Sequence, residues 1–139
     1  DVLAYKSGFA VKEVEDKDPI QRHHIYIAPA DYHLLLEKDL TFSLDMSEKI
    51  NFSRPSIDVT FESAADAFGK SVAGLLLSGA NADGVTGLQL IRERGGKIVV
   101  QDPRSAEVPY MPQQAIDRLT IDLVLTEFNT EEFLALITQ

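Results

Sequence analysis

The sequence contains no cysteine among its 139 residues. This absence excludes disulfide bonds, thiolate zinc sites and a cysteine nucleophile. A chain without disulfides fits a reducing compartment, so the sequence predicts a cytoplasmic protein. The three histidines, His23, His24 and His33, show no metal-ligand spacing, and we therefore predict no metal site and no cofactor.

Positive charge and long hydrophobic runs are also scarce. Thirteen Lys and Arg stand against 22 Asp and Glu, which gives a net charge of −9 and a sequence pI near 4.7. This balance excludes a general nucleic-acid binder. No apolar run approaches the roughly 20 residues needed to cross a bilayer, so we predict no membrane insertion. With 45% hydrophobic residues the chain can build one core, and we treat 1–139 as one domain or most of one.

The first half of the chain has strand-like segments separated by turns. Residues 9–14, 25–28, 34–37 and 40–44 are short apolar or β-branched runs, and Lys38-Asp39 is short enough for a hairpin turn. We expect antiparallel pairing throughout this half.

The second half alternates between helical and strand periodicity. Residues 57–68 carry apolar side chains at helical spacing, with Ser56 as the expected N-cap and Gly69 as the expected stop. Further helices are expected at 84–94, 112–119 and 130–137, and strands at 72–77, 97–100 and 123–125. This order predicts an α/β fold, a doubly wound parallel sheet in a three-layer sandwich with an antiparallel β-hairpin excursion.

The turn after the strand at 72–77 is the strongest candidate site. Residues 78–83 are Ser-Gly-Ala-Asn-Ala-Asp, small residues ending in one acid. Ligands of open α/β sheets bind at the carboxyl ends of strands, where this turn is expected to lie. Asp83 has two interpretations: the N-cap of the helix that follows, or a carboxylate that orients a histidine.

Other candidate residues flank helix starts or turns. His33 follows the turn at 28–32 and is either a buried, hydrogen-bonded histidine beside a pocket or a catalytic base. Arg54 is either a carboxylate-recognising guanidinium or part of a structural ion pair. Met111 lines an apolar pocket or fills the core. No Gly-x-Ser-x-Gly elbow and no Gly-rich phosphate loop occurs, so neither a serine nucleophile nor a nucleotide site is visible.

Four stretches of the sequence resemble the chemotaxis protein-glutamate methylesterase family, the CheB-type catalytic domain. They occur in the family's order and span most of the chain: Tyr26-Ile-Ala-Pro-Ala-Asp-Tyr-His33, Ser53-Arg-Pro-Ser-Ile-Asp-Val-Thr-Phe-Glu-Ser-Ala-Ala65, Gly74-Leu-Leu-Leu-Ser-Gly-Ala-Asn-Ala-Asp-Gly84, and Val99-Val-Gln-Asp-Pro-Arg-Ser-Ala-Glu-Val-Pro-Tyr-Met-Pro-Gln-Gln-Ala-Ile116. The resemblance implies a doubly wound α/β fold. It also implies hydrolysis of methyl esters on receptor glutamates, often with glutamine deamidation.

The resemblance also implies a serine nucleophile, a histidine base and an aspartate, and it assigns the aspartate's role to Asp83. Pocket residues implied or suggested around it are Ser78, Gly79, Ala80, Asn81, Arg54, Met111 and His33. The family usually has Thr-Gly-Met-Gly before the acid, so Ala80 stands where a Met would flank the site. Neither the serine motif nor the histidine motif is present.

The chain therefore resembles the C-terminal part of a methylesterase domain that lacks its N-terminal portion. The alternative is a non-catalytic regulatory or binding module that keeps the fold. The implied partners are methylated chemoreceptor helices and a receiver domain or response regulator acting in trans.

Overall fold

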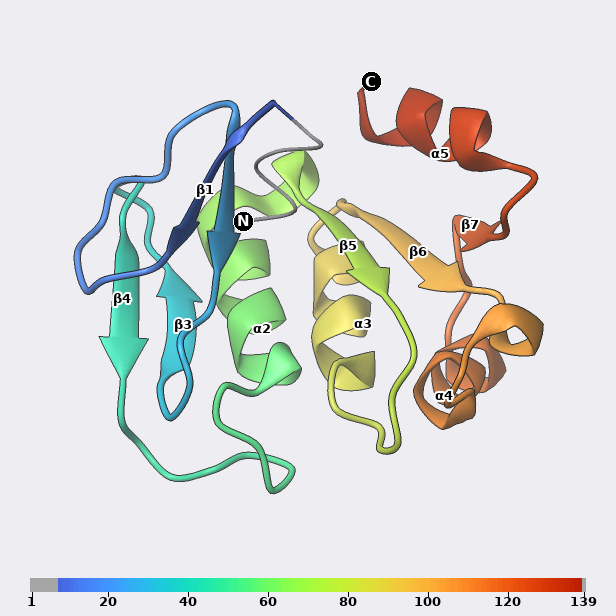
Figure 1. Ribbon diagram of the computed structural model, residues 1–139. Helices are drawn as coiled ribbons and strands as arrows, with labels where there is room; N and C mark the ends of the chain where they lie inside the picture. Colours follow the sequence, from blue (N-terminus) through green and yellow to red (C-terminus); the bar gives the residue numbers. More distant parts are fainter. Residues whose placement is uncertain (1–7, 139) are drawn as a thin grey trace.

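The computed structural model describes residues 8–138, so residues 1–7 and 139 of the predicted domain lie outside the described part (Figure 1). The strands are β1 (Ala10–Glu13), β2 (His24–Ile27), β3 (His33–Leu36), β4 (Phe42–Asp45), β5 (Ala73–Leu76), β6 (Lys97–Gln101) and β7 (Leu123–Leu125). The α-helices are α2 (Ile57–Phe68), α3 (Val85–Glu93), α4 (Tyr110–Arg118) and α5 (Thr130–Ile137), with single 3₁₀ turns at Gly69–Ser71 and Pro103–Ser105. None of the helices in residues 8–138 is long and apolar enough to cross a membrane.

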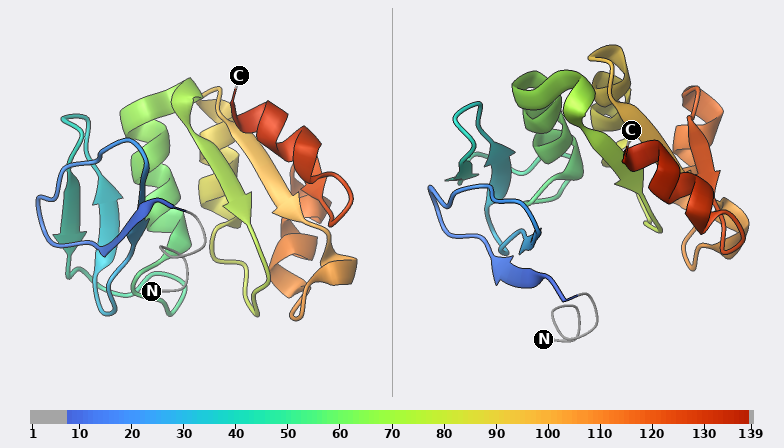
Figure 2. Two further views of the ribbon diagram at one scale, coloured as in Figure 1. Left: turned by 45° about the horizontal axis from the view of Figure 1, so that its top comes forward. Right: turned by 90° about the horizontal axis from the view of Figure 1, so that it is seen from above.

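The strands form three small sheets. β5, β6 and β7 pair in parallel in that order, β3 and β4 form an antiparallel hairpin, and β1 pairs with β2. Helices α2 and α3 lie on one face of the β5–β6–β7 sheet, and α5 lies on the opposite face (Figure 2). The prediction of an α/β fold with a parallel sheet, helices on both faces and a hairpin excursion is confirmed.

Helix α2 begins and ends where the sequence predicts. The Ser56 hydroxyl accepts a hydrogen bond from the Val59 amide, and Ser56 itself has extended backbone angles, as an N-cap requires. At the other end Gly69 has φ 51°, and its amide donates to the Ala65 carbonyl. A positive φ suits glycine, because it has no Cβ to clash there. Both boundaries follow from local chemistry.

The expected antiparallel pairing of β1 and β2 is wrong. These two strands run parallel, with Ala10 opposite His24 and Glu13 opposite Ile27. The connection at 14–23 bonds to the tip of the β3–β4 hairpin: the Lys17 amide donates to the Phe42 carbonyl, and the Phe42 amide donates to the Asp18 carbonyl. The connection therefore runs along the hairpin before β2 starts. As a result β2 begins at the same end of the pair as β1, and the two strands are parallel.

The tip of the β3–β4 hairpin is also longer than the predicted two-residue turn. The chain leaves β3 after Leu36 and enters β4 at Phe42, and the Glu37 amide donates to the Thr41 carbonyl across the loop. Leu40 takes a positive φ of 65° inside it. Lys38-Asp39 lies in the turn but does not form it alone.

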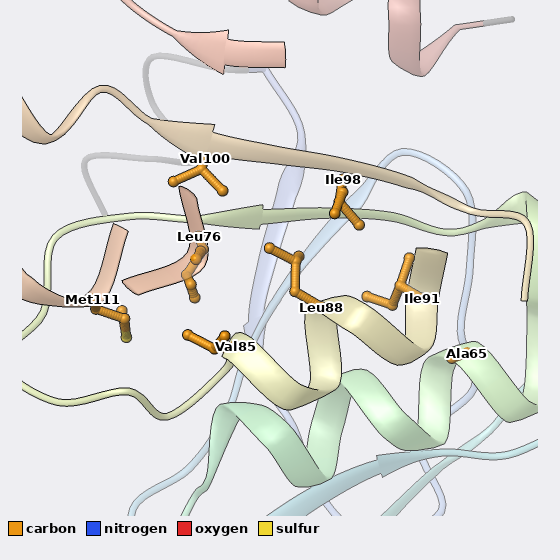
Figure 3. Packing of buried hydrophobic residues seen from close by; sticks show 9 residues of the cluster. Ala65, Leu76, Val85, Leu88, Ile91, Ile98, Val100 and Met111 are labelled. Carbon is orange, nitrogen blue, oxygen red and sulfur yellow. The ribbon is translucent and has the colours of Figure 1, made fainter. Parts of the chain in front are cut away.

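The main core lies between the β5–β6–β7 sheet and α3. Leu88 and Ile91 of α3 are fully buried and point toward Leu76, Ile98 and Val100 of the sheet (Figure 3). Burying side chains of this size contributes about 1.5–3 kcal/mol each. This core fixes the start of α3 relative to the end of β5, which is where the candidate site lies.

Gly87 allows α2 and α3 to approach closely. A Cβ added at this position would lie 2.7 Å from the Phe61 Cβ and 3.1 Å from the Asp58 backbone. We expect Gly87→Ala to lower stability by about 1–3 kcal/mol, because the overpacking outweighs the gain in helix propensity. Thermal unfolding measures the effect, with the exposed neighbour Thr86→Ala as a control that stays within about 0.5 kcal/mol. A Gly87→Ala variant as stable as the wild type would contradict the close packing.

Four parallel strands, β1, β2, β5 and β7, each have an edge without a strand partner in the described residues, and apolar side chains are exposed at two of them. β5 pairs only with β6, and β2 pairs only with β1. Leu77, directly after β5, is 49% exposed, and Ile27 in β2 is 39% exposed. Parallel sheets are normally covered on both faces, and their edge strands are normally protected by charge, short length or a covering element.

We therefore expect the isolated chain to bind a hydrophobic dye and to self-associate as its concentration rises. Leu77→Ser should reduce both signals, whereas Phe52→Ser, at a site 98% exposed but away from these edges, should leave the self-association unchanged. Sedimentation and dye fluorescence measure the two effects. A monodisperse monomer that binds no dye would show that the edges are already protected.

Candidate active site

The turn between β5 and α3 is tied to the start of α4. The Ser78 hydroxyl donates to the Val108 carbonyl at 3.2 Å and accepts from the Val108 amide at 2.8 Å. The Gly79 amide donates to the same carbonyl, and the Gly79 carbonyl accepts from the Met111 amide, both at 3.0 Å. The Ser78 hydroxyl is thus used to hold the turn.

Met111 supports this turn from the core. It is 5% exposed and belongs to the main hydrophobic cluster. A Cβ on Gly79 would lie 2.6 Å from the Met111 methyl carbon, so a larger residue there would displace the methionine. Ala80 and Asn81 are exposed at the tip. Of the predicted pocket residues in this turn, Ser78 is also exposed and Gly79 is half-buried.

Asp83 lies at the end of the turn and is almost completely buried, at 4% exposed. Its carboxylate points toward the start of α2. Oδ2 accepts from the Ile57 amide at 2.6 Å, and Oδ1 accepts from the Ser56 hydroxyl at 2.7 Å and from the Asp58 amide at 3.2 Å. Asn51 Nδ2 also donates to Oδ1, at 3.0 Å. The position of this carboxylate is therefore fixed by four donors.

The first of the two interpretations of Asp83, the N-cap of its own helix, is wrong. Gly84, with φ 103°, is the N-cap residue of α3. Glycine has no side chain to accept a hydrogen bond from the first amides of this helix. The free amides of Gly84 and Gly87 donate instead to Asp58 Oδ1, at 2.9 and 2.7 Å. Asp83 caps α2, and Asp58 in α2 caps α3.

His33 and Ser56 are both fully buried next to Asp83. The Ser56 amide donates to His33 Nδ1 at 3.1 Å, so Nε2 carries the proton and donates to the Glu48 carbonyl at 2.8 Å. The Ser56 hydroxyl bonds to Asp83 and not to the imidazole. Nucleophilic catalysis needs the hydroxyl on the ring nitrogen and access for substrate, and this group has neither. It is a structural network behind Asp83.

Arg54 holds the loop that precedes α2. Its Nη1 donates to the carbonyls of Met46 and Ser47 at 3.3 and 3.2 Å. No carboxylate in residues 8–138 forms an ion pair with it, and its buried Nε has no hydrogen-bond partner in that part of the chain. The structure thus differs from the structural ion pair that the sequence suggested as one alternative.

The carboxyl end of β6 carries an acid that sequence reasoning did not single out. Arg104 donates to both oxygens of Asp102 from Nε and Nη2, at 2.8 to 3.1 Å. This bonding, with the Arg104 amide as a further donor, holds the pKa of Asp102 below its usual value. Next to it a hollow of about 450 Å³ is lined by Leu77, Gln101, Ser105, Leu125, Thr126 and Glu127. Asp83 does not line this hollow.

Comparison with known proteins identifies the family. The family model described as CheB methylesterase matches residues 1–132. The chain belongs to the CheB methylesterase family. A relative from Leptospira interrogans is 50% identical over 125 residues, which cover 90% of this chain and 65% of that protein. The protein-glutamate methylesterase/protein-glutamine glutaminase of Hydrogenovibrio crunogenus is 37% identical, over 94% of this chain and 36% of that protein.

A solved CheB structure has the same fold. The CheB methylesterase catalytic domain of Thermotoga maritima superposes with a TM-score of 0.88 at 33% identity, over 96% of this chain and 72% of that domain. The chain therefore spans less than two thirds of the curated relatives named above and about three quarters of this CheB catalytic domain.

Sequence analysis did not identify two residues of the candidate site, Asn51 and Asp58. Asp58 stands in the first turn of a predicted helix, where an acid ordinarily interacts with its own helix N-terminus. Its bonds to Gly84 and Gly87 cross to another helix, and the Asn51 bond to Asp83 spans 32 positions. Only the packing of α2 on α3 brings these groups together. The available signal in the sequence was that α2 and α3 each have an acid at their N-terminal end, Asp58 and Asp83.

Proposed function

We propose that residues 1–139 are the C-terminal part of a protein-glutamate methylesterase domain, in which Asp83 orients the histidine base. The observation that carries this proposal is the carboxylate of Asp83, held at the carboxyl end of β5 in a chain of the CheB family. A buried, fixed carboxylate is what a catalytic histidine needs to keep one tautomer and to stabilise its charged form.

The proposed reaction is acyl transfer. A histidine deprotonates a serine hydroxyl, the serine oxygen attacks the ester carbonyl, and methanol leaves with the proton that the histidine returns. Water then attacks the acyl-serine and releases the glutamate. With a glutamine substrate the same path releases ammonia. The serine and the histidine come from the part of the domain that this chain does not provide.

The proposed substrates are methylated glutamates on chemoreceptor helices. The exposed residues Ala80 and Asn81 form the rim that such a helix would meet, and Ala80 leaves more room than the family's usual methionine. Ser78, Gly79 and Met111 hold this turn against the start of α4. His33 bonds to the start of α2, and Arg54 holds the loop that precedes it. Control by a receiver domain or response regulator is part of the same proposal.

The proposed function is tested with the longer protein that would contain residues 1–139 together with the serine and the histidine, called the parent below. The test measures the release of methanol. The parent is incubated with a chemoreceptor fragment carrying labelled methyl esters, and mass spectrometry follows glutamate and glutamine at each site. We expect labelled methanol and new glutamate. If an unrelated methylesterase demethylates the same fragment and the parent does not, the non-catalytic module becomes the better account.

A further inference from the structure

Two carboxylates cap each other's helices at the candidate site. Asp83, which precedes α3, accepts from the first amides of α2, Ile57 at 2.6 Å and Asp58 at 3.2 Å. Asp58, in α2, accepts from the amides of Gly84 and Gly87 at 2.9 and 2.7 Å. The free N–H groups of each helix are satisfied by the carboxylate that belongs to the other. Any shift of α2 against α3 therefore moves Asp83.

The amide of Asn51 joins the two carboxylates. Its Nδ2 donates to Asp58 Oδ2 at 2.8 Å and to Asp83 Oδ1 at 3.0 Å, and a side-chain amide has the two hydrogens that this requires. Without a donor between them the two carboxylates would repel each other. Asn51 lies in a tight turn in which Ile50 and Ser53 exchange both backbone hydrogen bonds. Its φ of 54° is one that asparagine tolerates better than most residues.

The two oxygens of Asp83 are unequally occupied. Oδ1 accepts from Asn51 Nδ2, the Ser56 hydroxyl and the Asp58 amide, whereas Oδ2 accepts from the Ile57 amide alone. A carboxylate oxygen has about two lone-pair directions. Oδ1 is therefore filled, and Oδ2 keeps acceptor capacity for one more donor.

We propose that Asn51 and Asp58 are positioning residues, which fix the orientation of the Asp83 carboxylate so that Oδ2 faces the imidazole N–H of the catalytic histidine. This inference rests on the proposed function. Asn51 acts directly on Oδ1, and Asp58 acts through Asn51 and through the start of α3. Neither touches the substrate or the reacting atoms.

The test is Asn51→Gly in the parent methylesterase. Glycine keeps the positive φ of the turn and removes only the amide. We expect kcat to fall about 10- to 100-fold, because a small misplacement of a catalytic group has effects of this size, and KM to stay within about twofold. The acid limb of the pH profile of kcat/KM should move to lower pH, since a poorly placed Asp83 stabilises the protonated histidine less.

Two further variants complete the experiment. Asn51→Asp keeps the turn and the shape of the side chain but has no hydrogens to donate, so it should lower kcat as Asn51→Gly does. This variant therefore separates the loss of the donor from any loosening of the turn by glycine. Phe52→Gly is the matched control, because Phe52 shares the turn with φ 63° and is 98% exposed. It should keep the wild-type kcat and acid limb.

The outcomes separate this inference from the proposed function. If both Asn51 variants keep kcat and the acid limb of the wild type while Asp83→Asn is inactive, the positioning role is overturned and the role of Asp83 stands. If Asp83→Asn is also fully active, the proposed role of Asp83 fails. Lower stability with unchanged kcat and pH profile would show a purely structural role for Asn51 and would also overturn the inference.

Discussion

Under the proposed function, Asp83→Asn is expected to slow ester hydrolysis by the parent protein by about 10⁴-fold, the loss seen when the acid of a serine-histidine-aspartate triad is replaced by its amide. The amide can no longer hold the histidine in one tautomer or balance its positive charge. The hydrogen bonds of Asp83 predict that the free energy of unfolding also falls, by about 1–3 kcal/mol. All four partners of Asp83 are donors, and an asparagine NH₂ placed among them leaves at least one without an acceptor.

The loss of stability requires a matched control. Val14→Ala is expected to lower stability by a similar amount, because it removes buried methyl groups from a separate cluster of Val14, Leu34 and Phe42, and to leave the contact between α2 and α3 intact. Rates are measured well below the unfolding temperature of each variant and are normalised to the folded fraction. Methanol release should remain near wild type in Val14→Ala and nearly vanish in Asp83→Asn. Equal losses in the two variants would mean that Asp83 acts only through the stability of the fold.

The isolated chain 1–139 is expected to show no ester turnover at all. Within residues 8–138 the serine that bonds to both His33 and Asp83 is Ser56, but only its backbone amide bonds to the imidazole, and its hydroxyl is buried and bonded to the carboxylate. Asp83 alone offers no covalent path to the product.

Methanol release by the purified chain, with the parent as positive control, checks this expectation. The Asp83→Asn variant of the isolated chain distinguishes its own activity from that of a contaminant. Turnover that this substitution abolishes would contradict the account, because the chain would then hold a complete catalytic set.

The sequence predicts the second half of the fold well because its signals are local. The apolar spacing of 57–68, the hydroxyl of Ser56 and the glycine at 69 act within a few residues, and α2 has these bounds. The alternation of helix and strand then leaves a parallel sheet as the expected arrangement. Pairing in the first half depends on contacts of residues 17–20 with residues 40–42, which no local pattern encodes.

The candidate site is only partly visible from sequence. The small-residue turn before Asp83 and its place after a buried strand are readable, and the family resemblance supplies the proposed role. The bonds that hold Asp83 come from the start of another helix and from the turn at Asn51, and they exist only after α2 packs on α3. One of the two sequence interpretations of Asp83, the N-cap of its own helix, therefore named the wrong helix.

A crystal structure of the parent protein tests the central claim most directly. We predict an imidazole nitrogen of a histidine other than His23, His24 or His33 at about 2.6–3.2 Å from Asp83 Oδ2, with the opposite ring nitrogen facing a serine hydroxyl. Asp83 Oδ1 should keep its bonds to Asn51, Ser56 and Asp58 in that structure. A parent structure in which no histidine reaches either oxygen of Asp83 would contradict the account.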